Sequence, residues 1–431
     1  MGSTNRNELF SHKIDWVTVA LYCAIVFWGW LNIYAVTYDP EASMSIFNLN
    51  SDLGPVYAGR QLLFIAGAFL IIMAILIMDM RFYETFGYII YGAILFLLLL
   101  VPLIGKEVGG NKAWLGIGSF GVQPSEFAKF ATALAVAKYI GSVGFKMDLL
   151  RNQIILFVMI GVPMVLILLQ KDTGTALVFT AFTVAYFREG MAPFLILAGI
   201  AAAIIFVLTL LVNQYYLFIG IGVILIAAII LGKKKTKRIL LLSGIAVALC
   251  CVIISVDYVI TDVLKPHQQN RVKALINPDA DPLGYGWNVT QSKIAIGSGG
   301  FFGKGFLEGT QTKFNFVPEQ STDFIFCTIG EEHGWLGSLF MMALFVALLL
   351  RVIYIAERQK NRFARVYGYS VACIFLFHFA VNIGMTVGLF PVIGIPLPFF
   401  SYGGSGLWGF TILLFILLKL DVHRMQVLQR I

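Results

Sequence analysis

Residues 215–238 read YYLFIGIGVILIAAIILGKKKTKR. The first eighteen residues of this stretch carry no charge, and the last six include five lysines or arginines. A helix that crosses the hydrocarbon core of a bilayer needs about 20 mostly apolar residues, and cytoplasmic loops of membrane proteins are enriched in Lys and Arg. The stretch therefore predicts a transmembrane helix that ends at the cytoplasmic face.

The composition of the whole chain agrees with a membrane protein. Of the 431 residues, 59% are hydrophobic and only 13% are charged, whereas soluble domains carry about 25% charged residues. The pattern predicts an all-α polytopic membrane protein, with residues 1–431 as a single membrane domain of ten to twelve spans; we favour about twelve. The predicted spans are residues 16–36, 60–79, 86–104, 124–141, 152–170, 173–188, 191–213, 215–232, 238–256, 324–350, 367–390 and 403–420.

Cysteine usage and net charge exclude two other classes of function. The five cysteines lie in apolar runs without metal-ligand spacing or a pairing pattern, so we interpret them as small buried hydrophobes. A net charge of +8 would suggest nucleic-acid binding in a soluble protein. Here a bias of cytoplasmic loops toward basic residues and the attraction of anionic headgroups account for it. We therefore expect membrane lipids as partners, and neither nucleic acid nor a cysteine metal site.

A second basic cluster sets the orientation of the polar segment 257–323. The cluster comprises Arg351, Arg358, Lys360, Arg362 and Arg365, and the positive-inside rule places it in the cytoplasm with the first. One predicted span separates each cluster from 257–323, so this segment lies outside. It is far longer than the usual connection of about 4–6 residues, and it is rich in Phe, Ile, Trp and Gly, unlike disordered chain. We expect it to be a large extracytoplasmic loop that contains the catalytic residues.

Segment 257–323 holds six basic residues on the side that topology keeps poor in them: Lys265, Arg271, Lys273, Lys293, Lys304 and Lys313. They predict an anionic ligand; the alternative is a solvated surface that rests on lipid headgroups. Residues 297–305 read GSGGFFGKG around Lys304. Successive backbone N–H groups in such a loop can cradle phosphate, with the lysine as a point charge. The alternative is a flexible turn.

Asp281 begins the sequence Asp-Pro-Leu-Gly. Pro282 biases the preceding residue toward an extended conformation, so the carboxylate lies at a rigid turn. A fixed carboxylate near the membrane surface can serve as a general base; the alternative is an Asx-type turn. Asp279 is the rival base, two residues away.

Charged residues also occur inside the predicted spans. Glu126 and Lys129 are three residues apart at the start of span 124–141, so they share a helix face and can pair. Charges at membrane depth are costly and usually line a cavity; the alternative is a structural ion pair. Asp172, at the outer end of two spans, is placed to join them. Gly and Pro residues in 382–405 interrupt helix, which is tolerated at that depth only where the backbone is buried or lines a cavity.

Several motifs follow one another in order along the chain: WLG at 114–116, QPSEFAK at 123–129, QNRV at 269–272, DPLGYGWN at 281–288, QSKIAIGSGG at 291–300, GKG at 303–305, GTQ at 309–311 and NIGM at 382–385. Together they resemble the SEDS family (shape, elongation, division and sporulation), and in particular its RodA branch. The resemblance extends from about residue 60 to residue 420.

The resemblance implies a core of about ten spans, so the chain would carry one extra transmembrane hairpin, which we place at 191–232. It also implies a peptidoglycan glycosyltransferase that polymerises lipid II during cell elongation and shape maintenance. Such an enzyme lies in the bacterial inner membrane with its catalytic face in the periplasm. It works with a class B penicillin-binding protein, a PBP2-like transpeptidase, within the elongation machinery.

The family motif falls on Asp281 and implies that it is the catalytic carboxylate. We expect Asp281 to act as the base, with Arg271, Lys293 and Lys304 near the donor pyrophosphate. The remaining candidate substrate-binding residues are Glu126, Lys129, Trp114 and Asp172. One departure concerns Asp172, because residues 171–173 read Lys-Asp-Thr where the family more often has Pro-Asp-Leu.

The sequence leaves the need for a divalent cation open. No ligand spacing is visible, although Asp281 and a pyrophosphate together offer oxygen ligands for Mg²⁺ or Mn²⁺.

Two other functions remain as alternatives. A lipid II flippase would use the same cavity and the same intramembrane charges. A non-catalytic scaffold for a penicillin-binding protein would need many spans but not the charged residues of 257–323.

Overall fold

The computed structural model describes residues 14–38, 56–108, 111–117, 120–193, 212–231, 236–258, 285–314 and 316–428, with a few single positions between 197 and 209. Contacts divide the chain into two compact units. The first comprises Met1–Met191 with Gln291–Ile431, and the second comprises Ala192–Thr290.

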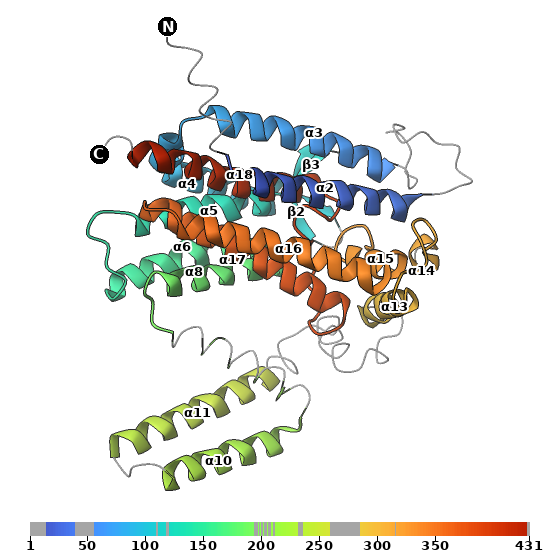
Figure 1. The fold of residues 1–431 in the computed structure, drawn as a ribbon. Coiled ribbons are helices and arrows are strands. Elements are labelled where there is room, and N and C mark those ends of the chain that lie inside the picture. Colours follow the sequence, from blue (N-terminus) through green and yellow to red (C-terminus); the bar gives the residue numbers. More distant parts are fainter. Residues whose placement is uncertain are drawn as a thin grey trace. The chain divides into compact units, whose positions relative to one another are not determined.

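The first unit is a bundle of long helices (Figure 1): α2 (Trp16–Thr37), α3 (Val56–Ile77), α4 (Met80–Ile104), α5 (Pro124–Ile140), α6 (Leu150–Leu169), α16 (Gly334–Glu357), α17 (Arg362–Thr386) and α18 (Gly404–Leu428). All of these except α5 are long and apolar enough to cross a membrane, which makes seven candidate spans within the described residues. The predicted all-helical membrane class is confirmed. The count of about twelve spans stays a prediction.

Two predicted spans are interrupted. Residues 173–188 form three consecutive short helices, α7 (Thr173–Val178), η1 (Phe179–Ala181) and α8 (Phe182–Arg188). The span predicted at 324–350 is divided into α15 (Ile325–Glu332) and α16. Gly334 begins α16 with a φ of +63°, and a Cβ there would lie 2.3 Å from the backbone nitrogen of Gly303. A single helix across this point was therefore a wrong prediction, because another segment approaches the backbone too closely.

The centre of the first unit is formed by α5, α17 and α18. Within the apolar windows of α17 and α18, 78% and 83% of the residues are buried, against 17% for each of α3 and α4. α17 and α18 both contact α5, and α3 and α4 lie farther out against α18 and α5. Polar side chains on the three central helices are therefore shielded from lipid.

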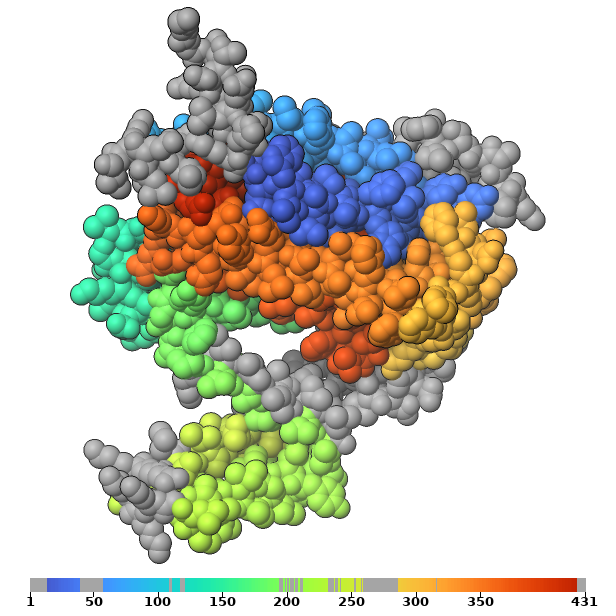
Figure 2. Space-filling model, in the orientation of Figure 1, coloured from blue at the N-terminus to red at the C-terminus, as the bar shows by residue number. Residues whose placement is uncertain are grey.

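The space-filling view shows α2 and α16 next to each other on one face of the first unit (Figure 2). Both helices carry exposed large hydrophobic side chains, such as Phe27 of α2 and Leu350 of α16. Exposed apolar side chains are expected on helices whose outer surface faces lipid tails.

The connection at 105–123, between two of the predicted spans, contains a small sheet. Strands β1 (Lys106–Val108), β2 (Asn111–Ile117) and β3 (Phe120–Val122) form an antiparallel meander in the order β1-β2-β3. Two-residue Gly-Gly and Gly-Ser links separate the strands in the sequence. Such links are the usual signal of a β-hairpin, and strands this short are easily missed.

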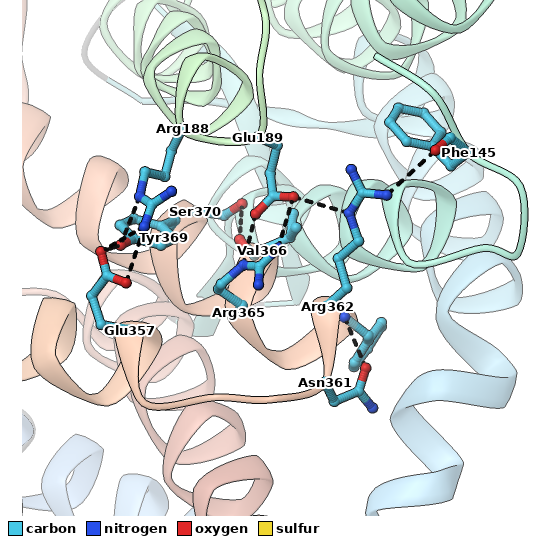
Figure 3. Close-up of polar contacts among 11 residues, drawn as sticks. Phe145, Arg188, Glu189, Glu357, Asn361, Arg362, Arg365, Val366, Tyr369 and Ser370 are labelled. Atoms are coloured by element: carbon cyan, nitrogen blue, oxygen red, sulfur yellow. Dashed lines mark hydrogen bonds and ion pairs between the residues drawn. The ribbon is translucent and has the colours of Figure 1, made fainter.

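The second basic cluster is bound by carboxylates from other helices (Figure 3). Arg362 and Arg365, at the start of α17, donate to Glu189 just after α8, at 3.0 and 2.9 Å. Arg188, the last residue of α8, lies 2.9 Å from Glu357 at the end of α16. These ion pairs join α8 to α16 and α17 at the end of the unit that we predict to be cytoplasmic.

Two more arginines, one in α16 and one directly after it, extend the same network. Arg351 donates to Asp15, which caps the start of α2, at 2.7 Å. Arg358 pairs with Asp421 of α18. The basic residues that set the predicted orientation therefore also form ion pairs that join five helices at one end of the unit.

The second unit contains α10 (Gln214–Ile230) and α11 (Thr236–Tyr258), which pack against each other. The hairpin seen in the described residues is thus 214–258. Residues 194–211 lie largely outside the described residues, so the extra hairpin at 191–232 stays a prediction. The remaining helices, α13 (Tyr285–Ser298) and α14 (Thr310–Lys313), belong to the predicted outer loop 257–323.

Candidate functional site

An ion pair is buried at the start of α5. Pro124 is in the first turn of the helix, where its missing N–H is not needed. Lys129 Nζ lies 2.7 Å from Glu126 Oε2, and the two side chains are 0% and 4% exposed. The pairing predicted from their spacing is present. Charges at this depth are costly, so the pair marks a candidate functional site.

The ammonium group of Lys129 has two further neighbours. Its Nζ lies 3.1 Å from His378 Nε2 on α17 and 4.3 Å from the centre of the Phe410 ring on α18. A cation over an aromatic face is attracted by the ring quadrupole. All three central helices therefore converge on one positive charge.

Asp172 connects a second segment to this site. Its Oδ1 accepts the N–H of Thr175 at 3.0 Å and so caps α7, and its Oδ2 accepts Gln123 Nε2 at 2.8 Å. Gln123 directly precedes α5, and its own N–H donates to Ser405 Oγ on α18 at 3.0 Å. Asp172 also attracts Lys129 electrostatically. The structure thus brings Asp172 to the Glu126–Lys129 pair.

A further carboxyl group lies just before α15. The main-chain carbonyl of Asp323 accepts Asn382 Nδ2 at 2.8 Å, and the same amide donates to Ile395 O at 2.7 Å. Burial raises the pKa of the Asp323 side chain to about 7, and the negative charges of Glu319 and Asp172 contribute to the rise. This carboxyl can therefore take up or release a proton near neutral pH.

Trp114 lies in β2, within the small sheet. A Cβ on Gly121 of β3 would lie 3.0 Å from Trp114 Cε3, so the indole packs over this glycine. β2 contacts both α4 and α5. The sheet therefore places Trp114 near the helix that carries the buried pair.

Lys293 is exposed on α13. Its neighbour Ser292 is fully buried and donates to Thr386 O at the end of α17, 2.9 Å away. One face of α13 therefore rests on α17 while Lys293 points away from the bundle interior.

The glycine-dense loop 297–305 is occupied by contacts with α15. The N–H groups of Lys304 and Gly305 both donate at 3.0 Å, to Glu331 O and Glu332 O, and that of Gly303 donates to Gly299 O at 2.8 Å. A Cβ on Gly303 would lie 2.1 Å from Glu332 O. These N–H groups cannot also cradle phosphate, so that part of the sequence prediction is wrong. The glycines permit close packing instead.

Lys304 itself is paired with a buried carboxylate. Its Nζ lies 2.7 Å from Glu331 Oε1, whose side chain is 0% exposed, and 2.7 Å from Thr310 Oγ1. The same carboxylate accepts the backbone N–H groups of Thr310, Gln311 and Thr312 at 2.8–2.9 Å. The geometry gives Lys304 a structural role, and its predicted contact with a pyrophosphate remains untested.

We expect Lys304→Ala to lower stability rather than to weaken substrate use. Removing a hydrogen bond to a buried charge costs about 1.5–3 kcal/mol, and Glu331 would lose its cation. Thermal unfolding in detergent and initial rates over a range of lipid II concentrations separate the two effects. Lys293→Ala is the matched control, which should leave unfolding unchanged. A raised KM for lipid II in a Lys304→Ala protein of normal stability would restore the anion-binding role.

Asp281 and Arg271 lie outside the described residues, as does the rival Asp279. Their predicted roles stay predictions. In the part of the chain that the structure describes, no group of three or more His, Cys, Asp or Glu side chains is arranged to hold a metal ion. The need for Mg²⁺ or Mn²⁺ therefore remains untested.

Three residues of this site had no role assigned from the sequence: His378, Asn382, which was noted only as the start of the NIGM motif, and Asp323. A signal existed for the first two. They are four residues apart, so they share one face of α17, and a histidine within an apolar span is a functional candidate by itself. Asp323 gave no comparable signal, because it stands in a polar segment among other carboxylates.

Comparison with protein families identifies relatives over nearly the whole chain. The family model described as a cell cycle protein, FtsW/RodA/SpoVE, matches residues 21–239 and 186–426. The chain is 35% identical to the peptidoglycan glycosyltransferase RodA of Treponema pallidum, over 85% of this chain and 90% of the relative. It is also 35% identical to the peptidoglycan glycosyltransferase MrdB of Escherichia coli K12, over 80% of each.

Solved structures agree. A chain from a peptidoglycan synthase complex, studied for its coordination of polymerization and crosslinking, matches with a TM-score of 0.68 and 25% identity, over 96% of this chain and 99% of that one. The rod shape determining protein RodA of Thermus thermophilus has the same fold, with a TM-score of 0.60 and 24% identity over 95% and 97%. The chain is therefore a member of the FtsW/RodA/SpoVE family, the SEDS proteins.

Proposed function

We propose that this protein is a peptidoglycan glycosyltransferase that polymerises lipid II during cell elongation and shape maintenance. The observation that carries the proposal is the 35% identity with relatives of that name over four fifths or more of both chains. The buried charges of the site support it, because charged residues at membrane depth usually line a functional cavity.

The proposed reaction joins the 4-hydroxyl of a GlcNAc acceptor to C1 of a MurNAc donor and releases undecaprenyl pyrophosphate. The donor is α-linked and the product is β-linked, so the transfer inverts configuration. Inverting glycosidases need a second carboxyl to protonate a poor leaving group. Pyrophosphate is a good leaving group and needs neutralisation of charge more than a proton. One base and a set of cations are therefore sufficient.

We assign the roles on this chemistry. Asp281 removes the proton from the acceptor hydroxyl as the bond to C1 forms, and Arg271 and Lys293 neutralise the departing pyrophosphate. Electrostatic stabilisation of this kind is usually the largest single contribution to catalysis.

In this proposal the buried charged cluster around the Glu126–Lys129 pair binds the polar head of the substrate. Glu126, Lys129 and Asp172 are its charged residues, and β2, the strand that carries Trp114, contacts the same helix α5. The cluster is enclosed by the three central helices, so its charges act in a region of low dielectric and attract a polar head more strongly than they would in water.

The direct test uses purified protein, lipid II and a class B penicillin-binding protein whose transpeptidase site is blocked. Glycan chains resolved on a gel are the expected product. A preparation that binds its partner and translocates labelled lipid II, yet makes no glycan, would favour the flippase.

We further propose that the protein lies in the bacterial inner membrane with its catalytic face in the periplasm, bound to a PBP2-like transpeptidase of the elongation machinery. The placement rests on the two basic clusters and the parity of the spans between them and 257–323. The partner is proposed because the similar chain in the peptidoglycan synthase complex spans almost the full length of this protein.

Accessibility of introduced cysteines tests this orientation. The five native cysteines are first replaced, and single cysteines are then placed at Glu308, which is exposed, and at Lys235. We expect an impermeant maleimide to label the first in intact cells and the second only after permeabilisation. Labelling in the opposite order would overturn the topology and, with it, the periplasmic site.

A further inference from the structure

A single histidine is buried beside the Glu126–Lys129 pair. His378 of α17 is 1% exposed. Its Nε2 lies 3.1 Å from Lys129 Nζ, and its Nδ1 lies 3.0 Å from Pro396 O. Its ring meets that of Phe410 edge-on, with the centroids 4.7 Å apart. Both ring nitrogens are therefore engaged, each by a different segment of the chain.

The two partners select one form of the imidazole. An ammonium group has only donors, so His378 Nε2 must accept from Lys129. A carbonyl oxygen only accepts, so Nδ1 must carry the proton that goes to Pro396 O. Both conditions are met by the neutral Nδ1–H tautomer and by no other form. The ring is thus fixed in orientation and in protonation at once.

The same face of α17 makes a second contact with the segment after it. Asn382, one turn beyond His378, donates to Ile395 O at 2.7 Å. Neighbouring carbonyls, Ile395 O and Pro396 O, are therefore bound by side chains four residues apart on one helix. His378 connects this helix-free segment to the ammonium group of Lys129.

We propose that His378 is a positioning residue for substrate binding, which holds the Lys129 ammonium at the place where the polar head of the substrate enters. The inference rests on the proposed function of the Glu126–Lys129 pair. A lysine side chain has four rotatable bonds and three donors, and Glu126 fixes only one of these donors at 2.7 Å. The acceptor on His378 fixes a second donor, and the Phe410 ring, 4.3 Å away, holds the ammonium from a further side.

Three substitutions separate the two nitrogens of the ring. The amide of His378→Gln can place an acceptor near the position of Nε2 and so retain the contact with Lys129. The shorter His378→Asn can place a donor near the position of Nδ1 and retain only the contact with Pro396 O. His378→Leu removes both contacts but keeps an apolar side chain of similar reach.

The readout is the affinity of the full chain, in nanodiscs with its penicillin-binding partner, for fluorescently labelled lipid II. We expect His378→Gln to bind nearly as tightly as the wild type. His378→Asn and His378→Leu should bind about tenfold more weakly, as for the loss of one hydrogen bond to a charged group. If His378 acted only through packing, the Leu and Asn variants would bind lipid II at least as tightly as the Gln variant.

A spectroscopic measurement of the histidine tautomer does not depend on substrate. Nitrogen-15 NMR of labelled histidine should show His378 as the Nδ1–H tautomer, assigned by the loss of its signal in His378→Gln. Lys129→Arg should shift the Nε2 resonance and leave Nδ1 nearly unchanged.

The possible failures are distinct. A different tautomer, or equal lipid II affinity for the Gln and Asn variants, overturns the positioning role even if the wild type polymerises lipid II normally. Wild-type protein that binds lipid II with the expected dependence on His378 but makes no glycan overturns the proposed function and leaves the positioning role in place.

Discussion

Lys129→Met is expected to reduce glycan polymerisation by at least about a hundredfold, the usual effect of removing one fixed electrostatic group from a site. It should also destabilise the protein by roughly 3–5 kcal/mol, because it leaves the buried Glu126 without a counter-ion. Glycan yield from lipid II and thermal unfolding of the same preparation measure the two effects.

The paired variant Glu126→Gln with Lys129→Met separates activity from stability. Replacing a whole buried ion pair by uncharged residues is often neutral or stabilising, so the double variant should unfold near the wild-type temperature. It should still fail to polymerise, because the charges that receive the substrate head are gone. A stable double variant with normal polymerisation would show that the pair is only structural.

This pair illustrates what a sequence reveals about a buried site. Glu126 and Lys129 are three residues apart on one helix, and their contact follows from helix geometry alone. His378 touches the same ammonium group from 249 residues away. Such a contact depends on how α5, α17 and α18 pack, which no local pattern specifies. The helical membrane class and the contact between Glu126 and Lys129 were predictable, whereas the role of Asp323 and the packing that brings His378 to the ammonium group were not.

The loop at 297–305 shows the opposite case, in which a local pattern was present and misled. Glycine density permits both a phosphate cradle and a close approach of two backbones. In the sequence the two are indistinguishable, and the lysine in the middle favoured the first. In the structure the main-chain carbonyls of Glu331 and Glu332 in α15 accept the N–H groups of Lys304 and Gly305, and the Glu331 side chain accepts the lysine as well. The residues of α15 that accept these hydrogen bonds lie outside the glycine motif, so the motif alone could not reveal them.

Asp281→Asn is expected to lower glycan formation by about 10²–10⁴-fold, the contribution of a positioned general base. The substitution keeps the size of the side chain and most of its hydrogen bonding, but an amide cannot accept a proton at neutral pH. The variant should therefore fold, bind its penicillin-binding partner and bind lipid II as the wild type does. Glycan product from purified lipid II is the measurement, with affinity for lipid II determined on the same preparation.

Asp279→Asn is the control that separates the loss of a base from a general effect of charge. It removes the same charge two residues away, so any general effect of charge in this segment appears equally in both variants. Only a requirement for a base at position 281 predicts that Asp281→Asn is nearly inactive while Asp279→Asn loses little. A flippase needs no base there, and its lipid translocation would survive both changes. Normal polymerisation by Asp281→Asn, or loss of polymerisation in Asp279→Asn alone, would show that Asp281 is not the general base. The buried Glu126–Lys129 site would then need a base from another residue.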